Sequence, residues 1–578
     1  MHFCIRNLFY MLASSFISVQ GIKAQTETSL YLQTSEVNNL MVHYDADYGS
    51  LHRFYAIKSS PERIERLQHL IQDYQQHLSQ LDFNSLPTGS RADYILFRRD
   101  LAEALRKLQE QKEKQEEAAP WVSFASIIYT IERQRRRGEA PESQKVAGQL
   151  DSLTKELKNA IDKLSEGDSI DSKIVNHAVR ELHEMKKALG DVYAFYHGYD
   201  PMFTWWAQHP YQLADTLLAQ YAKSLKKKSK VVSAQKKDAS GIVGNPIGKE
   251  ELMRQLEYEM IPYTPEELIA IADKEFAWCD AQMLQASQDM GFGNDWKAAL
   301  EKVKNTYVSP GAQPQLILRL YNESVAFLKQ NDLITIPPIA EETWRMSMMT
   351  PRRQLVNPFF TGGEVISISY PTHTMSHEDK LMSMRGNNPH FSRATVHHEL
   401  IAGHGLQRFM NERYKTYRHF GTPFWTEGWA LYWERLLWDL GFPQSPEDRI
   451  GMLFWRMHRC ARIIFSLNYH LGQWTPQECI DFLVERVGHE RANAEGEVRR
   501  SFEGGYSPLY QIAYMIGGLQ FEALKKEWVD SRKMSYRQYH DAVLQQNAMP
   551  VEMLRVILTD QPPEKNFKTQ WRFYELGR

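Results

Sequence analysis

The chain has 578 residues, and its 69 lysines and arginines nearly balance 71 aspartates and glutamates, which gives a formal net charge of −2. A protein without an excess of positive charge offers no electrostatic case for binding nucleic acid. Beyond one short segment at the N-terminus the sequence has no long uncharged apolar run, so we expect no stable membrane insertion of the mature protein. The oligomeric state stays open.

Residues 1–25 have the pattern of a secretory signal peptide. His2 and Arg6 precede a short apolar stretch at 8–19, and the small residue Ala24 comes just before a polar sequence. Such an apolar core is too short to span a bilayer comfortably and is typical of an export signal. We therefore predict cleavage close to Ala24 and a periplasmic or secreted mature protein.

Three cysteines remain after the predicted signal peptide, namely Cys279, Cys460 and Cys479. An odd number without close spacing argues against a disulfide framework, although an exported protein could form one. Cys460 and Cys479 could pair, but we expect buried thiols.

The N-terminal part reads as a series of helices. Ser59 and Glu62 form a capping-box pattern, Pro61 suits a first helical turn, and apolar residues then repeat on one face. Helical patterns continue to about residue 197, and a lysine-rich, then small and flexible stretch follows at 226–245. We predict an N-terminal helical half at 26–245 and a catalytic helical half at 246–578.

Strand character appears at 343–348 and 364–370, with Gly362-Gly363 as a turn signal before the second run. A small sheet near the catalytic helix would offer an edge to which an extended peptide could pair its backbone. A purely structural sheet explains the pattern equally well.

The densest chemistry lies in the sequence from His397 to His404, which contains three histidines and Glu399. Imidazoles are good ligands for zinc, and a neighbouring carboxylate can take a proton from water. His398 and His404 are six residues apart and would face ~120° away from each other on a regular helix, so a local bulge is needed, which Gly403 would permit. His397 and His404, seven residues apart, need no distortion, so spacing favours His397 and the adjacent glutamate favours His398.

Several ordered motifs resemble the DUF885 family of bacterial proteins, which are expected to be metallopeptidases with an HExxPGH-type motif and an EGWALY-type motif. The matching residues are His398-Glu399, Gly403-His404, Leu406-Gln407, Glu427-Gly428-Trp429-Ala430-Leu431-Tyr432, Glu434, Arg459-Cys460-Ala461-Arg462, His470, Trp474-Thr475, Glu497-Val498, Arg500, Tyr514 and Gly517. Ala402 stands where the family usually has proline, and Ser466 stands where an aspartate is common.

This resemblance implies a mostly α, large multi-helical fold similar to the gluzincin peptidases, with a small β-sheet beside the metal-binding helix. It also implies that Glu427, on a second helix, completes the zinc site. Without the resemblance, Thr426 looks like an N-cap that places Glu427 in a first helical turn, where a carboxylate is stable without metal.

The sequence and the resemblance together predict one Zn²⁺ held by His398, His404 and Glu427, with Glu399 as general base. His470 or a tyrosine of the Gly-Gly-Tyr-Ser-Pro segment and the helix after it would polarise the substrate carbonyl, the candidates being Tyr506, Tyr510 and Tyr514.

The expected function is zinc-dependent hydrolysis of short peptides. One alternative is a zinc hydrolase of another amide, such as a cell-wall peptide or an acyl-amino acid. Another is a non-catalytic helical binding protein with a relic metal site. Endo- or exo-cleavage, side-chain preference and the native metal stay open.

Overall fold

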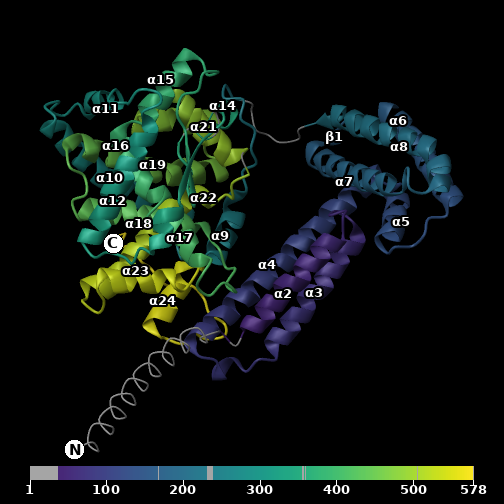
Figure 1. Ribbon diagram of the computed structural model, residues 1–578, viewed down its shortest axis with the longest axis horizontal. Helices are drawn as coiled ribbons and strands as arrows, with labels where there is room; N and C mark the ends of the chain where they lie inside the picture. Colours follow the sequence, from purple (N-terminus) through teal and green to yellow (C-terminus); the bar gives the residue numbers. More distant parts are fainter. Residues whose placement is uncertain are drawn as a thin grey trace, which may run out of the picture. The chain divides into compact units, whose positions relative to one another are not determined.

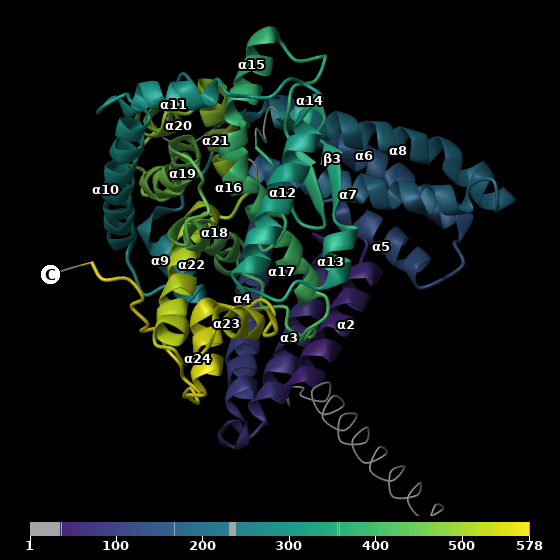
Figure 2. The ribbon, with the colours of Figure 1, turned by 60° about the vertical axis from the view of Figure 1, so that its left-hand side comes forward.

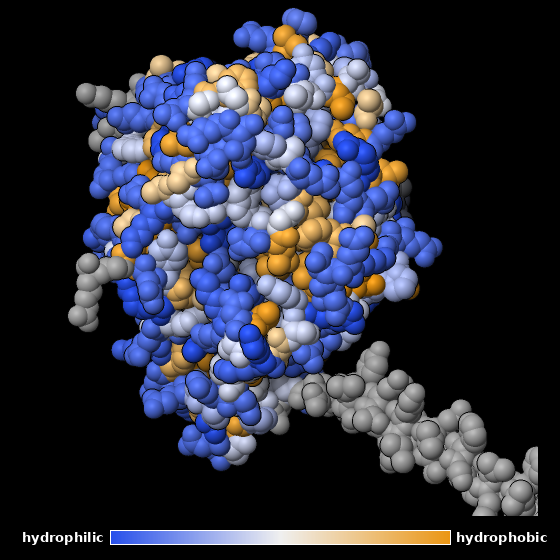
Figure 3. Space-filling view, turned by 90° about the vertical axis from the view of Figure 1, so that its left-hand side faces the viewer, coloured by the Kyte–Doolittle hydropathy of each residue, from blue (hydrophilic) through white to orange (hydrophobic). Residues whose placement is uncertain are grey.

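The computed structural model describes residues 35, 37–166, 168–230, 238–354, 357, 359–503 and 505–576. The predicted signal peptide at 1–25 lies outside these residues. The described chain is mostly helical, as predicted (Figure 1). No helix in this part of the chain is long and apolar enough to cross a membrane. On the face seen in Figure 3, hydrophilic residues predominate and hydrophobic residues form small groups.

The chain forms two compact units. The smaller unit comprises Glu36–Leu86 and Leu96–Gln235, and the larger unit comprises Pro87–Ile95 and Lys236–Arg578. We predicted a change at 245/246 between two continuous halves. The change at 235/236 falls inside the stretch expected to join them, but Pro87–Ile95 belongs to the larger unit.

A buried ion pair explains why this short segment belongs there. Asp93 and Arg418 have side chains that are 0% and 1% exposed, and Arg418 Nε donates to Asp93 Oδ1 over 2.7 Å. Thr88 also donates a hydrogen bond to Asp560, over 2.6 Å. The sequence pattern of a helix cannot reveal such distant partners.

The smaller unit is built from helices, and α5, α6, α7 and α8 contribute buried side chains to an apolar core within it. Its elements are α2 (Asn38–Phe54), α3 (Pro61–Ser79), η1 (Phe83–Ser85), the later part of α4 (Thr88–Ala118), η2 (Ala119–Trp121), α5 (Ala125–Arg136), α6 (Ser143–Glu166), β1 (Ile170–Asp171), α7 (Ser172–Tyr196), α8 (Pro201–Lys227) and β2 (Ser229–Lys230).

The predicted capping box of Ser59 and Glu62 is not formed. Helix α3 begins at Pro61 with Ser60 as its N-cap, and that cap makes no side-chain hydrogen bond. Ser59 instead donates its backbone N–H and its hydroxyl to Glu184 Oε2, each over 2.9 Å. A tertiary partner on α7 has replaced the local one.

The larger unit contains the remaining helices. They are α9 (Gly248–Tyr258), α10 (Pro265–Asp289), α11 (Trp296–Lys304), α12 (Gln313–Gln330), α13 (Pro338–Thr343), α14 (Pro351–Gln354), α15 (His377–Gly386), α16 (Pro389–Glu399), α17 (His404–Asn411), α18 (Pro423–Asp439), α19 (Pro446–His470), α20 (Pro476–Phe482), η3 (Leu483–Val487), α21 (Arg491–Phe502), α22 (Tyr510–Lys525), η4 (Lys526–Asp530), α23 (Tyr536–Leu544) and α24 (Val551–Thr559). Helix α19 packs against α10, α16 and α22 (Figure 2).

Helices α18 and α22 pack unusually closely because glycines meet between them. A Cβ added at Gly517 would lie 2.2 Å from the carbonyl oxygen of Phe424, and one added at Gly428 would lie 2.5 Å from Gly517 Cα. The absence of side chains at these positions brings the two helix backbones together. Residues of α22 are thereby placed beside those of α18.

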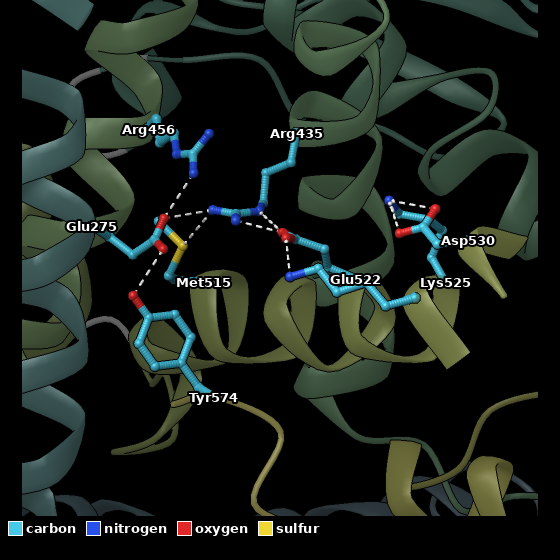
Figure 4. A network of polar contacts seen from close by, with 9 residues as sticks. Glu275, Arg435, Arg456, Met515, Glu522, Lys525, Asp530 and Tyr574 are labelled. Atoms are coloured by element: carbon cyan, nitrogen blue, oxygen red, sulfur yellow. Dashed lines mark hydrogen bonds and ion pairs between the residues drawn. The ribbon is translucent and has the colours of Figure 1, made fainter. Parts of the chain in front are cut away.

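Buried charges connect the same group of helices (Figure 4). Arg435 on α18 bonds Glu275 on α10 and Glu522 on α22, and Arg456 on α19 donates to Glu275 over 2.8 Å. Burial would raise the pKa of both carboxylates, but Arg435 outweighs it and lowers the pKa of Glu275 and of Glu522 to about 2. Removing one partner would leave a buried charge unpaired, so this network favours one arrangement of the four helices.

The predicted strands form a two-stranded parallel sheet. Strand β3 (Arg345–Met348) pairs with β4 (Val365–Ile368), with Arg345 opposite Val365. Before β4 the backbone runs against α16, since Gly363 N–H donates to the carbonyl of Glu399 over 3.1 Å. A Cβ at Gly362 would lie 2.3 Å from that carbonyl oxygen, so the two glycines allow the close approach.

The three cysteines of the described chain are buried free thiols, as expected. Cys479 directs its Sγ toward the carbonyl of Phe465, at 3.7 Å. Cys460 does not pair with Cys479, because the thiol that interacts with Cys460 is Cys279.

Candidate metal centre

The sequence from His398 to His404 spans a break between two helices. Helix α16 ends at Glu399, α17 begins at His404, and four residues link them. The link is held by Trp429, whose indole N–H donates to the carbonyl of Ala402 over 2.8 Å. A Cβ at Gly403 would lie 1.9 Å from the carbonyl oxygen of His398, so glycine is required there.

The break brings three possible ligand atoms together. His398 Nε2 and His404 Nε2 lie 3.6 Å and 3.2 Å from Glu427 Oε2, and one ligand atom from each residue lies within 4.8 Å of the others. Glu427 Oε2 is buried and has no hydrogen-bond partner among the described residues. Two imidazoles and a carboxylate with such an unmet oxygen fit a zinc site that keeps its fourth position open.

His397, the alternative ligand, points elsewhere. Its side chain is 0% exposed, and its ring packs edge-on against Phe442, with centroids 5.7 Å apart. Burial lowers the pKa of His397 to about 4. His397 is therefore a core residue, although its seven-residue spacing from His404 would need no distortion of a helix.

Glu427 lies further from the N-terminus of its helix, α18, than the sequence suggested. The helix begins at Pro423 and is capped by Thr422, whose hydroxyl accepts the N–H of Phe424 over 3.2 Å. The expectation that Thr426 is the N-cap was wrong, because the helix extends one turn earlier. Glu427 thus lies in the second turn, where the helix dipole gives a carboxylate little support.

Glu434 lies behind the ligands and was not assigned a role from the sequence. His398 Nδ1 donates to Glu434 Oε1 over 2.6 Å, and Arg459 donates to the same oxygen over 3.1 Å. Burial would lower the pKa of His398, but the nearby carboxylates of Glu427 and Glu434 raise it to about 9. A metal ion would displace the proton on Nε2, and the Nδ1 proton, held by Glu434, would leave the Nε2 lone pair to bind that ion.

The signal that could have found Glu434 is its spacing from Glu427. Seven residues on a helix return to within ~20° of the same face. Both carboxylates of α18 therefore reach the same histidine.

Glu399 lies at the side of a cleft that contains all three ligands. The cleft has a volume of about 580 Å³ and lies within the larger unit. Burial raises the pKa of Glu399, whereas the charges of His398 and His404 oppose the rise. Glu399 is thus a carboxylate whose basicity is higher than usual, as a general base at neutral pH requires.

Three tyrosines line the cleft. The hydroxyl of Tyr510 donates to Glu427 Oε1, and the Tyr514 ring lies parallel to His398 with centroids 6.1 Å apart. Tyr506 stacks on Tyr510 at 4.2 Å. Burial raises the pKa of Tyr510 and of Tyr514, so both phenols stay protonated and can donate hydrogen bonds.

His470 does not join this group. It is the last residue of α19, packs edge-on against Phe502 at 5.9 Å, and is not part of the cleft wall. Arg462, eight residues earlier on the helix, does line the cleft, which places His470 about 12 Å further along the axis. His470 is therefore not placed beside the metal ligands, and the three tyrosines are the candidates for polarising a substrate carbonyl that line the cleft.

Two solved structures have a fold similar to that of this chain. No curated protein matches the chain significantly. A structure from Shewanella oneidensis and one from Colwellia psychrerythraea, both described as a "putative lipoprotein", are 17% and 14% identical to this chain. Their TM-scores are 0.65 and 0.54; each comparison covers 91% of this chain, and 100% and 98% of the other.

The family model described as "Bacterial protein of unknown function (DUF885)" matches residues 55–558. This match includes every residue of the candidate metal centre and most of both units. The chain therefore belongs to the DUF885 family.

Proposed function

We propose that this protein is a zinc-dependent peptidase that cleaves short peptides by activating water. The observation that carries the proposal is the meeting of His398, His404 and Glu427 around a buried, unpartnered carboxylate oxygen, with Glu399 in the same cleft. A gluzincin-like mechanism fits this set, since it needs three protein ligands and one free carboxylate.

Zinc held by the three ligands would supply Lewis acidity, which lowers the pKa of water toward 7 and polarises a carbonyl oxygen. Glu399 accepts the proton of the attacking water and delivers it to the leaving amine, because one carboxylate can act in both half-reactions. Tyr514 is a donor that can stabilise the negative oxygen of the tetrahedral intermediate, and Tyr510 can do so when its hydroxyl turns away from Glu427. Glu434 keeps the His398 proton at Nδ1 throughout.

The substrate proposal rests on the size and position of the cleft. A volume of about 580 Å³ suits a short peptide, whereas a folded protein would have to unfold locally to reach ligands that are 2–14% exposed. The signal-like sequence at 1–25 and the lipoprotein description of the two similar structures support action outside the cytoplasm.

Metal content tests the ligand assignment. The purified chain should hold about one zinc ion, and Glu427→Ala should lower that occupancy by removing a ligand. His397→Ala is the matched comparison, since His397 is the other histidine considered and packs against Phe442. Full occupancy in Glu427→Ala together with loss in His397→Ala would reverse the assignment.

A further inference from the structure

Five arginines line the cleft that holds the metal ligands, and three of them, Arg459, Arg462 and Arg500, form a buried cluster. Arg459 and Arg462 come from α19, and Arg500 comes from α21. Their side chains are 5%, 2% and 11% exposed. Guanidinium groups this deeply buried need anionic partners, because the loss of hydration is otherwise uncompensated.

The described residues supply fewer partners than this cluster needs. Arg459 pairs with Glu434 at 3.1 Å, whereas Arg462 and Arg500 share Glu497, at 2.7 Å and 2.6 Å. Within the described part of the chain, three guanidinium groups thus pair with two carboxylates, which leaves one positive charge over. A divalent ion in the metal site would be balanced by Glu399 and Glu427 and would not compensate it.

The hydrogen bonds show the same deficit. Nε of Arg459, Nη1 of Arg462 and Nε of Arg500 are buried and have no acceptor among the described residues. The histidines beside this group add no further positive charge, because burial lowers the pKa of His489 to about 3 and holds that of His458 well below its usual value, so both are neutral. An anion entering the cleft would meet unsatisfied donors.

Tyrosine rings connect the arginines to the metal ligands. The Tyr514 ring lies 4.3 Å from the Arg462 guanidinium carbon and 6.1 Å from the His398 ring. The Arg500 guanidinium lies 5.6 Å from the Tyr506 ring, which stacks on Tyr510, the donor to Glu427. One continuous wall therefore carries both the excess charge and the proposed catalytic groups.

We propose that Arg500 and Arg462 bind the C-terminal carboxylate of the substrate, so that the enzyme acts on peptides whose scissile bond lies close to a free C-terminus. The planar, forked guanidinium matches a carboxylate with two parallel hydrogen bonds, and the ligand's charge neutralises the excess. The assignment of substrate class rests on the peptidase function proposed above. It predicts an exopeptidase acting from the C-terminal end.

Binding tests this subsite without requiring turnover. The zinc-loaded Glu399→Gln protein is titrated by calorimetry with an N-acetylated tripeptide, with its C-terminal amide, and with an amide that carries an aspartate side chain. We expect the free acid to bind 10–100-fold more tightly than either amide. Equal binding of the acid and the plain amide would overturn the inference, and tight binding of the aspartyl amide would show that any carboxylate serves.

Variants locate the effect at the cluster. Arg500→Gln should abolish the preference for the acid, and Arg500→Lys should keep part of it because the charge remains. Arg499→Gln is the matched control: Arg499 is the preceding residue of α21, has a 40% exposed side chain that pairs with Glu503, and does not line the cleft. A preference that persists in a folded Arg500→Gln protein would also overturn the assignment.

Turnover separates this inference from the proposed function. If the zinc-loaded enzyme cleaves acids and amides at equal rates, the peptidase proposal stands and the carboxylate subsite fails. If acids bind in an Arg500-dependent manner and no peptide is cleaved, the subsite stands and the peptidase proposal fails.

Discussion

The hydrogen bond between Glu434 and His398 gives a prediction with a magnitude. In Glu434→Gln the charged acceptor of the His398 Nδ1–H is replaced by a neutral amide, at a contact of 2.6 Å. Outer partners of metal-bound histidines typically contribute 10–100-fold to metal affinity, which corresponds to about 1.4–2.7 kcal/mol. We therefore expect zinc to bind 10–100-fold more weakly, as measured by competition with a chromophoric chelator.

The same substitution should also destabilise the metal-free protein. Glu434 pairs with Arg459, whose side chain is 5% exposed, and removing one partner of a buried pair costs about 3–5 kcal/mol. Urea unfolding measures that cost. The double variant Glu434→Gln/Arg459→Gln should regain much of the stability while zinc affinity stays low, because only the stability loss comes from the unpaired arginine.

An exposed glutamate provides the control. Glu495→Gln, on the exposed side of α21, should change neither zinc affinity nor stability beyond about 0.5 kcal/mol. Wild-type zinc affinity in a folded Glu434→Gln protein would refute the role assigned to Glu434. Recovery of zinc affinity in the double variant would show instead that the loss came from disorder around Arg459.

Three further predictions concern the backbone, acid stability and substrate size. Gly403→Ala should remove zinc binding and lower the free energy of unfolding by about 1–3 kcal/mol or more. Gly421→Ala is the control and should change neither property, because no atom lies within 4 Å of the added Cβ. If the two variants bind zinc equally well and are equally stable to urea, the prediction is contradicted. Burial lowers the pKa of His540 to about 3, so below pH 6.5 this side chain is protonated in the unfolded state but stays neutral in the folded state. The free energy of unfolding therefore falls as the pH falls, by about 2 kcal/mol at pH 5. His540→Gln should remove that part of the slope in urea titrations between pH 8 and pH 5, and an unchanged slope would count against it. Oligopeptides should be cleaved much faster than a native globular protein, and rapid chelator-sensitive digestion of the folded protein would exclude a recessed site.

Local patterns predicted much of the fold. Thr264 and Glu267, three residues apart, form a capping box at the start of α10, and the alternating sequence pattern located both strands of the sheet. These features depend on neighbours in sequence, so sequence suffices to predict them. Ser59 does not cap its helix because its hydroxyl donates to the distant carboxylate of Glu184. Thr426 is not a cap because α18 begins one turn earlier.

The candidate site also has features that the sequence predicts and features that depend on distant contacts. Spacing favoured His397, whereas the structure brings His398 to His404 through the break at Gly403, where backbone atoms come too close for any side chain. His470 seemed suitable by residue type, but the length of α19 takes it away from the cleft. The excess charge of Arg462 and Arg500 could not be read from spacing either, because it arises when α19 and α21 share the single carboxylate of Glu497.

One measurement tests the proposed function most directly, namely mass spectrometry of a defined peptide mixture incubated with zinc-loaded protein, with chelated protein and with zinc-loaded Glu399→Gln. The proposal predicts cleavage by the wild type, loss of cleavage on chelation, and a 10²–10⁴-fold lower rate in Glu399→Gln at unchanged zinc content. Intact peptides after incubation with zinc-loaded wild type would contradict a peptidase, and near-normal turnover in zinc-loaded Glu399→Gln would contradict the role of Glu399.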